Sequence, residues 1–579
     1  MRQQLLGILA YVVMIAASCQ SSTPSRATSD SIEPGTSAEP SAGSPPNLAH
    51  NQVLRVIIPI EPGTLDPTLA AGAIEVSVLR AVHRGLVSLD QDLKVVPELA
   101  ESWEVSDDAR TLTFHLRDAK YSNGDPIVAG DIVYGWKRLA DPRTAATYSY
   151  AMAEVVGGPE LLAMAGPDLP SDTDIETALD KLGVEAPDDK TFVVHLHTPA
   201  TYFLSAMTLW VFVPMQEKWI TGQGATEAAN HVSSGPFILD TWDHDVRIVL
   251  KPNPNWWGEV KPTLTEIQMS ILADPAAAQA AYEADEIDMV ATPSEDVQRI
   301  RSDPVLATEY REGTQLAVNF FAFNSFQDPN VASFANPGPT ANKDFRIALT
   351  QAIDKQALID LTYAGLGRVA NSFIMPGIPG HQPDLNPYPH DLDAAREHMD
   401  KALAALGVRS AAELGALPFG FPSGGAAAET KVAFLAEAWR QAFGLEFEQI
   451  PSEVGAHFGQ MGSGGYAIGW SGWGADYPHA NNQLSGTFTC GAANNVGQYC
   501  NPAFDALIAK AAAEPDQDKQ VAIYHEAETL LMNDAPILPV RFAVSPYEVK
   551  SYVSGLTVTP NDTRLPGDSY FETIQILKH

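Results

Sequence analysis

Apolar residues occur along this chain in two kinds of spacing. Short runs of β-branched and aromatic residues predict strands at Leu54–Ile60, 111–117, 191–197, 247–250 and 266–272. Longer stretches repeat apolar residues every three or four positions and predict helices at 344–363, 393–406, 429–443, 502–513 and 519–531. The mixture predicts an α/β protein of several lobes. No internal repeat is present, and the pattern alone determines no topology.

Length and charge narrow the class of protein. The chain has 579 residues, of which 45% are apolar and 18% charged. Because single hydrophobic cores stop growing at about 250–300 residues, we expect two or three domains. Lysine and arginine number 36 against 71 acidic residues, which gives a formal charge of −35. A surface this acidic repels phosphate backbones, so we exclude nucleic-acid binding.

The N-terminal residues have the pattern of an export signal. Arg2 precedes an apolar run from Leu5 to Ala17, which is too short to span a bilayer. The small residues before Cys19 resemble a bacterial lipobox, which implies a signal peptide at 1–18 and lipidation of Cys19. A plain secretory signal with a chance cysteine is the alternative. Residues 19–51 are rich in small and polar residues and predict a flexible linker at the outer, extracytoplasmic side of a membrane.

Two further cysteines, Cys490 and Cys500, lie close together in the sequence. In an exported protein such a pair predicts a disulfide, worth about 2–3 kcal/mol. A metal site would need two more ligands, and the neighbouring residues offer none. We therefore expect no metal and no cofactor.

The common catalytic motifs of exported hydrolases are missing from the sequence. No G-x-S-x-G sequence occurs, and His525–Thr529 begins like H-E-x-x-H but ends on threonine. There is also no phosphate-binding G-x-x-x-x-G-K-[ST] motif. These absences favour a binding protein over an enzyme, although paired carboxylates leave no fixed spacing.

Several sequence blocks together resemble one bacterial family. They occur in the family's order from about Leu54 to the end of the chain, at Glu61–Pro67, Gly85–Asp90, Pro97–Trp103, Thr113–Arg117, Tyr121–Asp125, Ser234–Phe237, Asn253–Gly258, Gly472–Pro478 and Ala535–Pro539. The chain is similar to the solute-binding proteins of oligopeptide and dipeptide ABC importers, family 5.

The resemblance implies an α/β fold like that of periplasmic binding proteins, a two-lobed hinged clamp of class II type with an additional inserted domain. By the matching blocks, lobe I is discontinuous and comprises 52–86, 210–313 and 540–579. The inserted domain II is expected at 87–209 and lobe III at 314–539. A chain that crosses more than once between two lobes forms a natural hinge.

The same resemblance implies the ligand contacts. Asp476 of the Gly472–Pro478 block would pair with a peptide's α-ammonium group, and Gly472, Trp473 and Gly474 would pair with its backbone. A counter-strand in lobe I matches Ala71, Gly72 and Ala73. The alternatives are a turn position for Asp476 and core packing for Trp473.

Two positions depart from the family pattern. Trp470 stands where some peptide binders have an arginine for the peptide's carboxylate. Arg541 is the candidate to reach the cleft in its place. The counter-strand also has Ala71 where an acidic residue can occur.

These observations predict a lipid-anchored, monomeric receptor without catalytic residues. It would capture an oligopeptide and deliver it to an ABC permease with its ATPase subunits. The second hypothesis keeps the fold and changes the ligand to an oligosaccharide, a metal chelate or an opine-like compound. The third hypothesis is an exported hydrolase.

Overall fold

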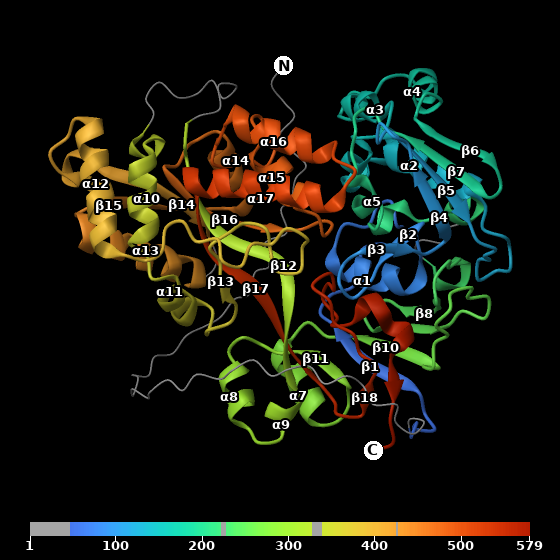
Figure 1. The fold of residues 1–579 in the computed structure, drawn as a ribbon. Coiled ribbons are helices and arrows are strands. Elements are labelled where there is room, and N and C mark those ends of the chain that lie inside the picture. Colours follow the sequence, from blue (N-terminus) through green and yellow to red (C-terminus); the bar gives the residue numbers. More distant parts are fainter. Residues whose placement is uncertain (1–46, 222–226, 327–337, 424–425) are drawn as a thin grey trace.

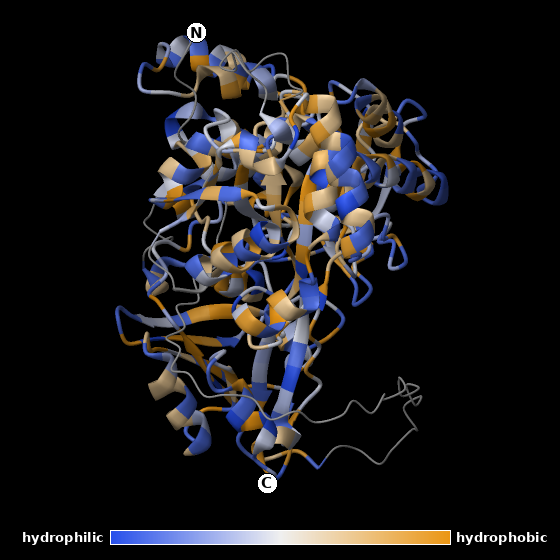
Figure 2. Ribbon diagram, turned by 90° about the vertical axis from the view of Figure 1, so that its left-hand side faces the viewer, coloured by the Kyte–Doolittle hydropathy of each residue, from blue (hydrophilic) through white to orange (hydrophobic). Residues whose placement is uncertain are grey.

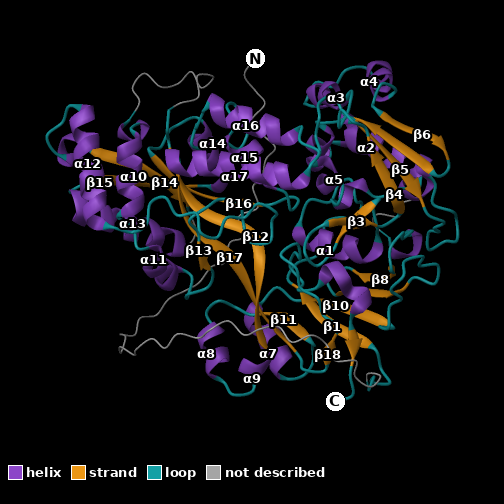
Figure 3. Ribbon diagram, in the orientation of Figure 1, coloured by secondary structure: helices purple, strands orange, loops and turns teal. Residues whose placement is uncertain are grey.

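The chain forms two lobes joined by long strands, with a further domain beside them (Figure 1). The computed structural model describes residues 47–221, 227–326, 338–423 and 426–579. The predicted signal peptide, Cys19 and most of the predicted linker lie outside these residues. Helices and strands mix along the described chain, so the predicted α/β class is confirmed (Figure 3). None of the described helices is both long and apolar enough to cross a membrane.

One large sheet runs through both lobes. Within the described residues it has 11 strands in the order β15-β14-β16-β12-β17-β11-β1-β10-β9-β8, and β13 pairs with β17. In that order the strands are β15 Glu446–Ser452, β14 Ala416–Pro422, β16 Ile468–Gly474, β12 Tyr310–Phe323, β17 Ile537–Val549, β11 Met289–Ala291, β1 Val53–Ile58, β10 Glu266–Ile271, β9 Arg247–Pro252, β8 Phe237–Asp243 and β13 Arg368–Val369. The strands predicted at 54–60, 247–250 and 266–272 are confirmed as β1, β9 and β10.

Strands β12 and β17 cross from one lobe to the other (Figure 1). They pair in antiparallel register from Tyr310 opposite Glu548 to Ala322 opposite Ile537. Two register shifts interrupt this pairing near the middle of β12. Such irregularities bend and twist a strand pair, so the crossing contains points where the sheet changes direction. The predicted lobe boundaries at 313/314 and 539/540 fall inside these strands, and the lobe division itself stays a prediction.

The lobe around β1 has its own core, to which distant parts of the sequence contribute. Strand residues such as Val56 and Phe237 pack against helix α1, Ala73–Val82, and against Phe571 near the C-terminus. The remaining elements of this lobe are α6 Glu217–Thr221, α7 Pro275–Glu283, α8 Val297–Ser302, α9 Leu306–Glu309, β18 Val553–Ser554 and β19 Gln575–Ile576.

This lobe includes residues that the sequence assigns to the linker. Leu48 forms a β-bridge with Leu577, and the Ala49 N–H donates to the Ile576 carbonyl oxygen at 2.9 Å. The folded part therefore begins by Asn47. The sequence placed the end of the linker too late because these residues carry no strand pattern of their own.

A second domain packs around a four-stranded sheet in the order β4-β5-β7-β6 and a β2–β3 hairpin, counted in the described residues. Its elements are β2 Val87–Leu89, β3 Val95–Pro97, β4 Ala100–Val105, β5 Thr111–Leu116, α2 Ala129–Ala140, α3 Gly158–Met164, α4 Asp172–Leu179, β6 Val184–Asp188, β7 Thr191–His195 and α5 Phe203–Ala206. The fully buried Trp136 meets the rings of Phe192 and Phe212 at 5.0 and 4.6 Å. The strands predicted at 111–117 and 191–197 are confirmed as β5 and β7.

The opposite lobe is the most helical part of the molecule, and Figure 2 shows hydrophilic and hydrophobic residues alternating along helices. Its helices are α10 Lys343–Gln351, α11 Lys355–Thr362, α12 Leu392–Leu406, α13 Ala426–Phe443, α14 Val454–Gly462, α15 Ala480–Phe488, α16 Pro502–Ala512 and α17 Gln517–Asp534. The single helix predicted at 344–363 was wrong, because the chain forms α10 and α11 there. The Asp354 carboxylate accepts the Ala357 N–H at 3.0 Å and starts a new helix. The other four predicted helices are confirmed as α12, α13, α16 and α17.

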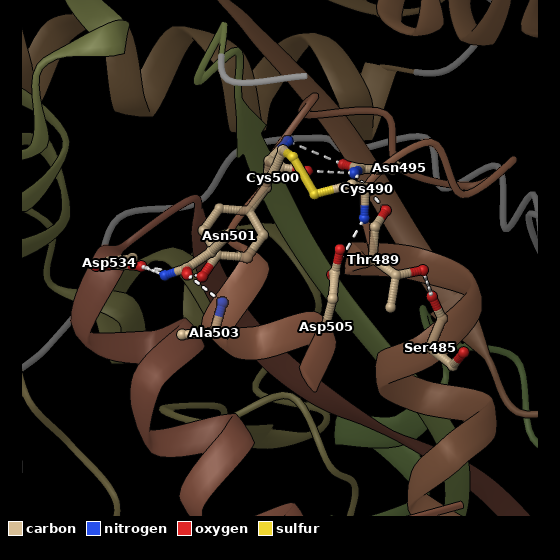
Figure 4. Close-up of a disulfide and its surroundings, with 10 residues drawn as sticks. Ser485, Thr489, Cys490, Asn495, Cys500, Asn501, Ala503, Asp505 and Asp534 are labelled. Atoms are coloured by element: carbon tan, nitrogen blue, oxygen red, sulfur yellow. Dashed lines mark hydrogen bonds between the residues drawn. A yellow bond between two sulfur atoms is a disulfide. The ribbon is translucent and has the colours of Figure 1, made fainter. Parts of the chain in front are cut away.

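Cys490 and Cys500 form a disulfide that closes the loop between α15 and α16 (Figure 4). Inside the loop, Asn495 donates from Nδ2 to the Thr489 carbonyl oxygen at 3.1 Å. The Cys490 N–H donates to Asp505 Oδ1 on α16 at 3.3 Å. The loop is therefore held by hydrogen bonds as well as by the covalent link.

A pair of buried histidines makes stability depend on pH. The rings of His83 and His231 lie 5.2 Å apart, and both contact Trp219. Neither nitrogen of His83 has a hydrogen-bond partner in the described structure. Burial lowers the pKa of His83, and it lowers the pKa of His231 to about 3.

We predict that His83→Phe weakens this pH dependence. The unfolded chain binds these protons near pH 6.5 and the folded chain does not, so the free energy of unfolding falls below that pH by about 1.4 kcal/mol per pH unit for each histidine. Urea unfolding at about pH 7.5 and about pH 5 measures this change. The free energy of unfolding should fall less between the two pH values in the variant than in the wild type. The control is His115→Phe, at a half-exposed position of β5. Its free energy of unfolding should fall as much as that of the wild type. Equal losses in His83→Phe and the wild type would contradict the assignment.

Candidate functional site

The Gly472–Pro478 block lies at the end of β16, where the strand has a sheet neighbour on one side only. Strand β16 pairs in antiparallel register with β12, and Gly472 lies opposite Asn319. On the other edge, β14 pairs only with Ile468 and Gly469. In the described residues, the last part of β16 is therefore unpaired along this second edge.

The backbone groups of Gly472 and Gly474 face the unpaired edge. Hydrogen-bonded and non-bonded residue pairs alternate along an antiparallel ladder. The Ala475 N–H donates to the Leu316 carbonyl oxygen at 2.8 Å, so Trp473 is also turned toward β12. Gly472 and Gly474 consequently direct their N–H and C=O groups outward. An extended ligand can pair with them as an added strand.

Trp473 separates the two glycines. It is half-buried against the core of the helical lobe, and within the described chain its buried Nε1 has no hydrogen-bond partner. A Cβ atom at Gly474 would meet only the Leu316 carbonyl oxygen, at 3.9 Å. The site therefore has room beside Gly474, and a donor that the protein leaves unused.

Asp476 directly follows this strand end, and its half-buried carboxylate has no cationic partner in the part of the chain that the structure describes. Its backbone N–H donates to Asn482 Oδ1 at 3.1 Å, and Asn482 Nδ2 donates to Asp476 Oδ2 at 3.0 Å. The Tyr150 hydroxyl of the second domain also hydrogen-bonds to the carboxylate. Burial raises the pKa of Asp476, while the side-chain hydrogen bonds from Asn482 and Tyr150 oppose the rise. No lysine, arginine or histidine of the described chain is among the causes that shift the pKa of this carboxylate.

A row of aromatic rings leads from Asp476 to the lobe around β1. The Tyr150 ring lies 5.3 Å from that of Tyr148, which lies 4.6 Å from that of Trp210. Trp210 Nε1 donates to the Ala70 carbonyl oxygen at 3.1 Å. The row therefore ends beside the segment predicted to form a counter-strand.

That segment, Ala71–Ala73, is not a strand. Gly72 has extended backbone angles and is the residue before α1, and Ala73 is the first residue of the helix. The strand prediction was wrong because the helical pattern that begins at Ala73 determines the local structure. Ligand contact by these residues stays a prediction.

The second domain and the helical lobe contact each other beside the site. The Thr201 N–H donates to the Ala512 carbonyl oxygen at 3.1 Å, and the rings of Tyr202 and His479 lie 6.1 Å apart. Tyr477, next to Asp476, packs against the core of the second domain. The side chains around Asp476 thus come from both units. Within the described ranges, no group of three His, Cys, Asp or Glu side chains could hold a metal ion.

The two departures from the family pattern have different surroundings. Trp470 is 8% exposed and belongs to the core beneath β16. Arg541 lies on β17 opposite Asn319, to which it donates from Nε at 2.8 Å. Its Nη1 donates to the Leu366 carbonyl oxygen at 2.8 Å. Arg541 therefore lies in the same row across the sheet as Gly472, and its ligand contact stays a prediction.

Sequence reasoning missed Tyr150 and Asn482. Asn482 could have been suspected, because it lies six residues after Asp476 in the next helix. Tyr150 carries no such signal, because it belongs to another domain and reaches Asp476 only in the folded molecule.

Comparison with known proteins identifies the family. The model of the bacterial extracellular solute-binding proteins, family 5 Middle, matches residues 94–495. The chain belongs to this family. The resemblance seen in the sequence blocks and the two-lobed fold is thereby confirmed.

Curated relatives match nearly the whole chain. The oligopeptide-binding protein OppA of Bacillus subtilis is 27% identical over 84% of this chain and 87% of its own length. The periplasmic murein peptide-binding protein MppA of Escherichia coli is 27% identical over 92% of this chain and 94% of its own.

Solved structures share the fold. The unliganded open form of the murein tripeptide-binding protein MppA superposes with a TM-score of 0.78, at 26% identity, over 93% of this chain and 99% of that one. The Listeria monocytogenes OppA bound to peptide gives 0.65 at 25% identity, over 92% and 100%. The backbone is thus more similar to the open form than to this peptide complex.

Proposed function

We propose that this solute-binding protein captures short oligopeptides between its lobes and delivers them to the permease of an ABC importer. The observation that carries the proposal is Asp476, a half-buried carboxylate with no cationic partner among the described residues, at the end of a strand with an unpaired edge. An α-ammonium group supplies the cation, and an extended peptide backbone supplies the neighbouring strand. The relatives named for oligopeptides and murein peptides support this ligand class.

The proposed binding mode depends little on ligand side chains. Backbone hydrogen bonds at Gly472 and Gly474 are the same for every residue type, and the ammonium group is present on every free peptide. Closure of the lobes excludes water and strengthens both interactions. The mode therefore suits a receptor that accepts many sequences.

The proposal also includes the cellular setting. We infer that the chain performs no chemistry, that Cys19 carries a lipid, and that the monomeric protein works outside the cytoplasm with a permease and its ATPase subunits. A neutral oligosaccharide is disfavoured as a ligand, because it would leave the Asp476 carboxylate unpaired.

Replacing Asp476 by asparagine should abolish tight peptide binding. The substitution keeps the shape and removes the charge that pairs with the ammonium group, at a cost of about 2–5 kcal/mol. Titration calorimetry with a tripeptide and its N-acetylated form measures the effect. The wild type should prefer the free amine, and Asp476→Asn should bind both forms equally weakly. Unchanged affinity in the variant would refute the assignment.

Two substitutions at Gly474 test the unpaired edge. Gly474→Ala keeps the outward N–H in a position with space for the methyl group, so affinity should stay near the wild-type value. Gly474→Pro removes the N–H and should weaken peptide binding up to about tenfold, the value of one hydrogen bond. Circular dichroism checks that both variants fold. Equal affinities for the two folded variants would argue against strand addition here.

Peptide affinity should fall in acid at a higher pH than for an ordinary aspartate. Asp476 must be ionised to bind the ammonium group, and burial raises its pKa above the usual value in the free protein. Tyr150→Phe removes a hydrogen bond that stabilises the ionised carboxylate. The peptide affinity of this variant should therefore begin to fall at a still higher pH. Calorimetry between about pH 7 and pH 4, above the usual pKa of a peptide carboxyl group, measures both curves. Superimposable curves would exclude the contribution of Tyr150.

A further inference from the structure

A segment near the C-terminus lies against the strand pair that crosses between the lobes. We call residues 558–568 the C-terminal strap. The pairing of β12 with β17 shifts register between Thr314 and Val318. In this interval the Leu316 N–H donates to the Pro560 carbonyl oxygen of the strap at 3.3 Å. The strap therefore satisfies a backbone donor at the point where the crossing strand is irregular.

The strap also packs closely against glycines of the crossing strand and of the helical lobe. A Cβ atom added to Gly313 on β12 would be 3.3 Å from Val558 Cγ1. A Cβ atom added to Gly377 would be 3.0 Å from Pro560 Cγ. Gly377 is followed by Ile378, which belongs to the core of the helical lobe. The strap is thus in contact with the part of the molecule that moves when the lobes change their angle.

The strap is anchored on α1, in the lobe around β1. Arg80 Nη1 donates to the Asn561 carbonyl oxygen. The hydroxyl groups of Ser77 and Thr563 hydrogen-bond to each other. Arg80 also forms an ion pair with the buried Asp568, at 3.4 Å. The strap therefore ties α1 of one lobe to the crossing strand and to the other lobe.

A pair of carboxyl groups holds the strap in shape. One oxygen of Asp562 accepts the Thr559 N–H, and the other accepts the Ser569 N–H at 2.9 Å. Asp568 accepts both the N–H and the hydroxyl of Thr563. The two carboxyl groups also hydrogen-bond to each other. Because ionised carboxylates only accept hydrogen bonds, this contact needs a proton on one of them.

The pair is unlikely to accommodate a second negative charge without loss of stability. Burial and the charge of Asp568 raise the pKa of Asp562. Arg80 faces the pair from α1, Tyr547 from β17 and Tyr570 from the residues after the strap, and Arg80 alone among these carries a positive charge. An aspartate in a released strap loses its proton at a lower pH, so rising pH weakens the attached strap.

We propose that the C-terminal strap restrains the opening of the lobes and thereby regulates peptide affinity at the candidate site. This inference rests on the proposed function and deepens it. Leu316 connects the two features, because its N–H donates to the strap and its carbonyl oxygen accepts the Ala475 N–H directly after β16. With the strap in place, the empty protein samples few openings, and ligand binding requires little further ordering. A loosened strap widens this range, so all peptides lose affinity by the same factor.

The test uses the full chain and two readouts. Small-angle X-ray scattering gives the radius of gyration of the empty protein, and calorimetry gives its affinity for a free tripeptide and for the N-acetylated form. Asp562→Ala removes the acceptor of two N–H groups, and Asp562→Asn keeps the side-chain shape without a charge. Pro560→Gly makes the strap more flexible. Asp400→Asn, at an exposed position of α12, is the control.

We expect Asp562→Ala and Pro560→Gly to increase the radius of gyration of the empty protein. Both variants should bind the two peptides several-fold more weakly, with an unchanged ratio between them, whereas Asp400→Asn should match the wild type. From about pH 6 to about pH 9 the radius of gyration of the wild type and of Asp400→Asn should rise. That of Asp562→Asn should stay constant, because this side chain has no proton to lose.

Two results would overturn the inference. If Asp562→Ala and Pro560→Gly keep the native circular dichroism spectrum and the wild-type radius of gyration, the strap does not restrain the lobes. If affinity falls for the free tripeptide alone, the effect lies at the Asp476 contact and not at the crossing strands. If the wild type binds no peptide, the proposed function fails, and the radius of gyration alone decides whether the strap restrains the lobes.

Discussion

Strand β12 is hydrogen-bonded along both edges, and this constraint organises the molecule. One edge pairs with β17 over nearly its whole length, and the other pairs with β16 from Ala317 onward. The β12–β17 pair crosses between the lobes, while the β12–β16 pair determines which backbone groups of β16 face outward. The crossing and the candidate site therefore share one strand.

The Asp476 carboxylate is the main electrostatic feature of the candidate site. It is half-buried, and hydrogen bonds from Asn482 and Tyr150 stabilise it. Taking this charge partly out of water raises the free energy of the empty protein. In the proposed function, the α-ammonium group of the ligand supplies the counter-charge.

The acidic surface has a simple relation to this site. A net charge of −35 repels polyanions. The aromatic row from Tyr150 to Trp210 connects Asp476 to the lobe around β1 through rigid side chains. The side chains around Asp476 thus come from more than one part of the molecule, whereas each core is built mainly from its own elements.

Apolar spacing and the ordered sequence blocks were enough to predict the local elements and the motif. Strands such as β5 and helices such as α12 follow from apolar spacing, and the ordered blocks identify the family and Asp476, because these signals lie within short stretches of chain. The sequence could not show the break before α11, where one capping aspartate outweighs a continuous apolar pattern. The fold settled the rest: which edge of β16 stays unpaired in the described residues, that Ala73 starts a helix, and that Tyr150 approaches Asp476. These depend on strand order and on contacts between residues far apart in the chain, for which sequence spacing carries no signal.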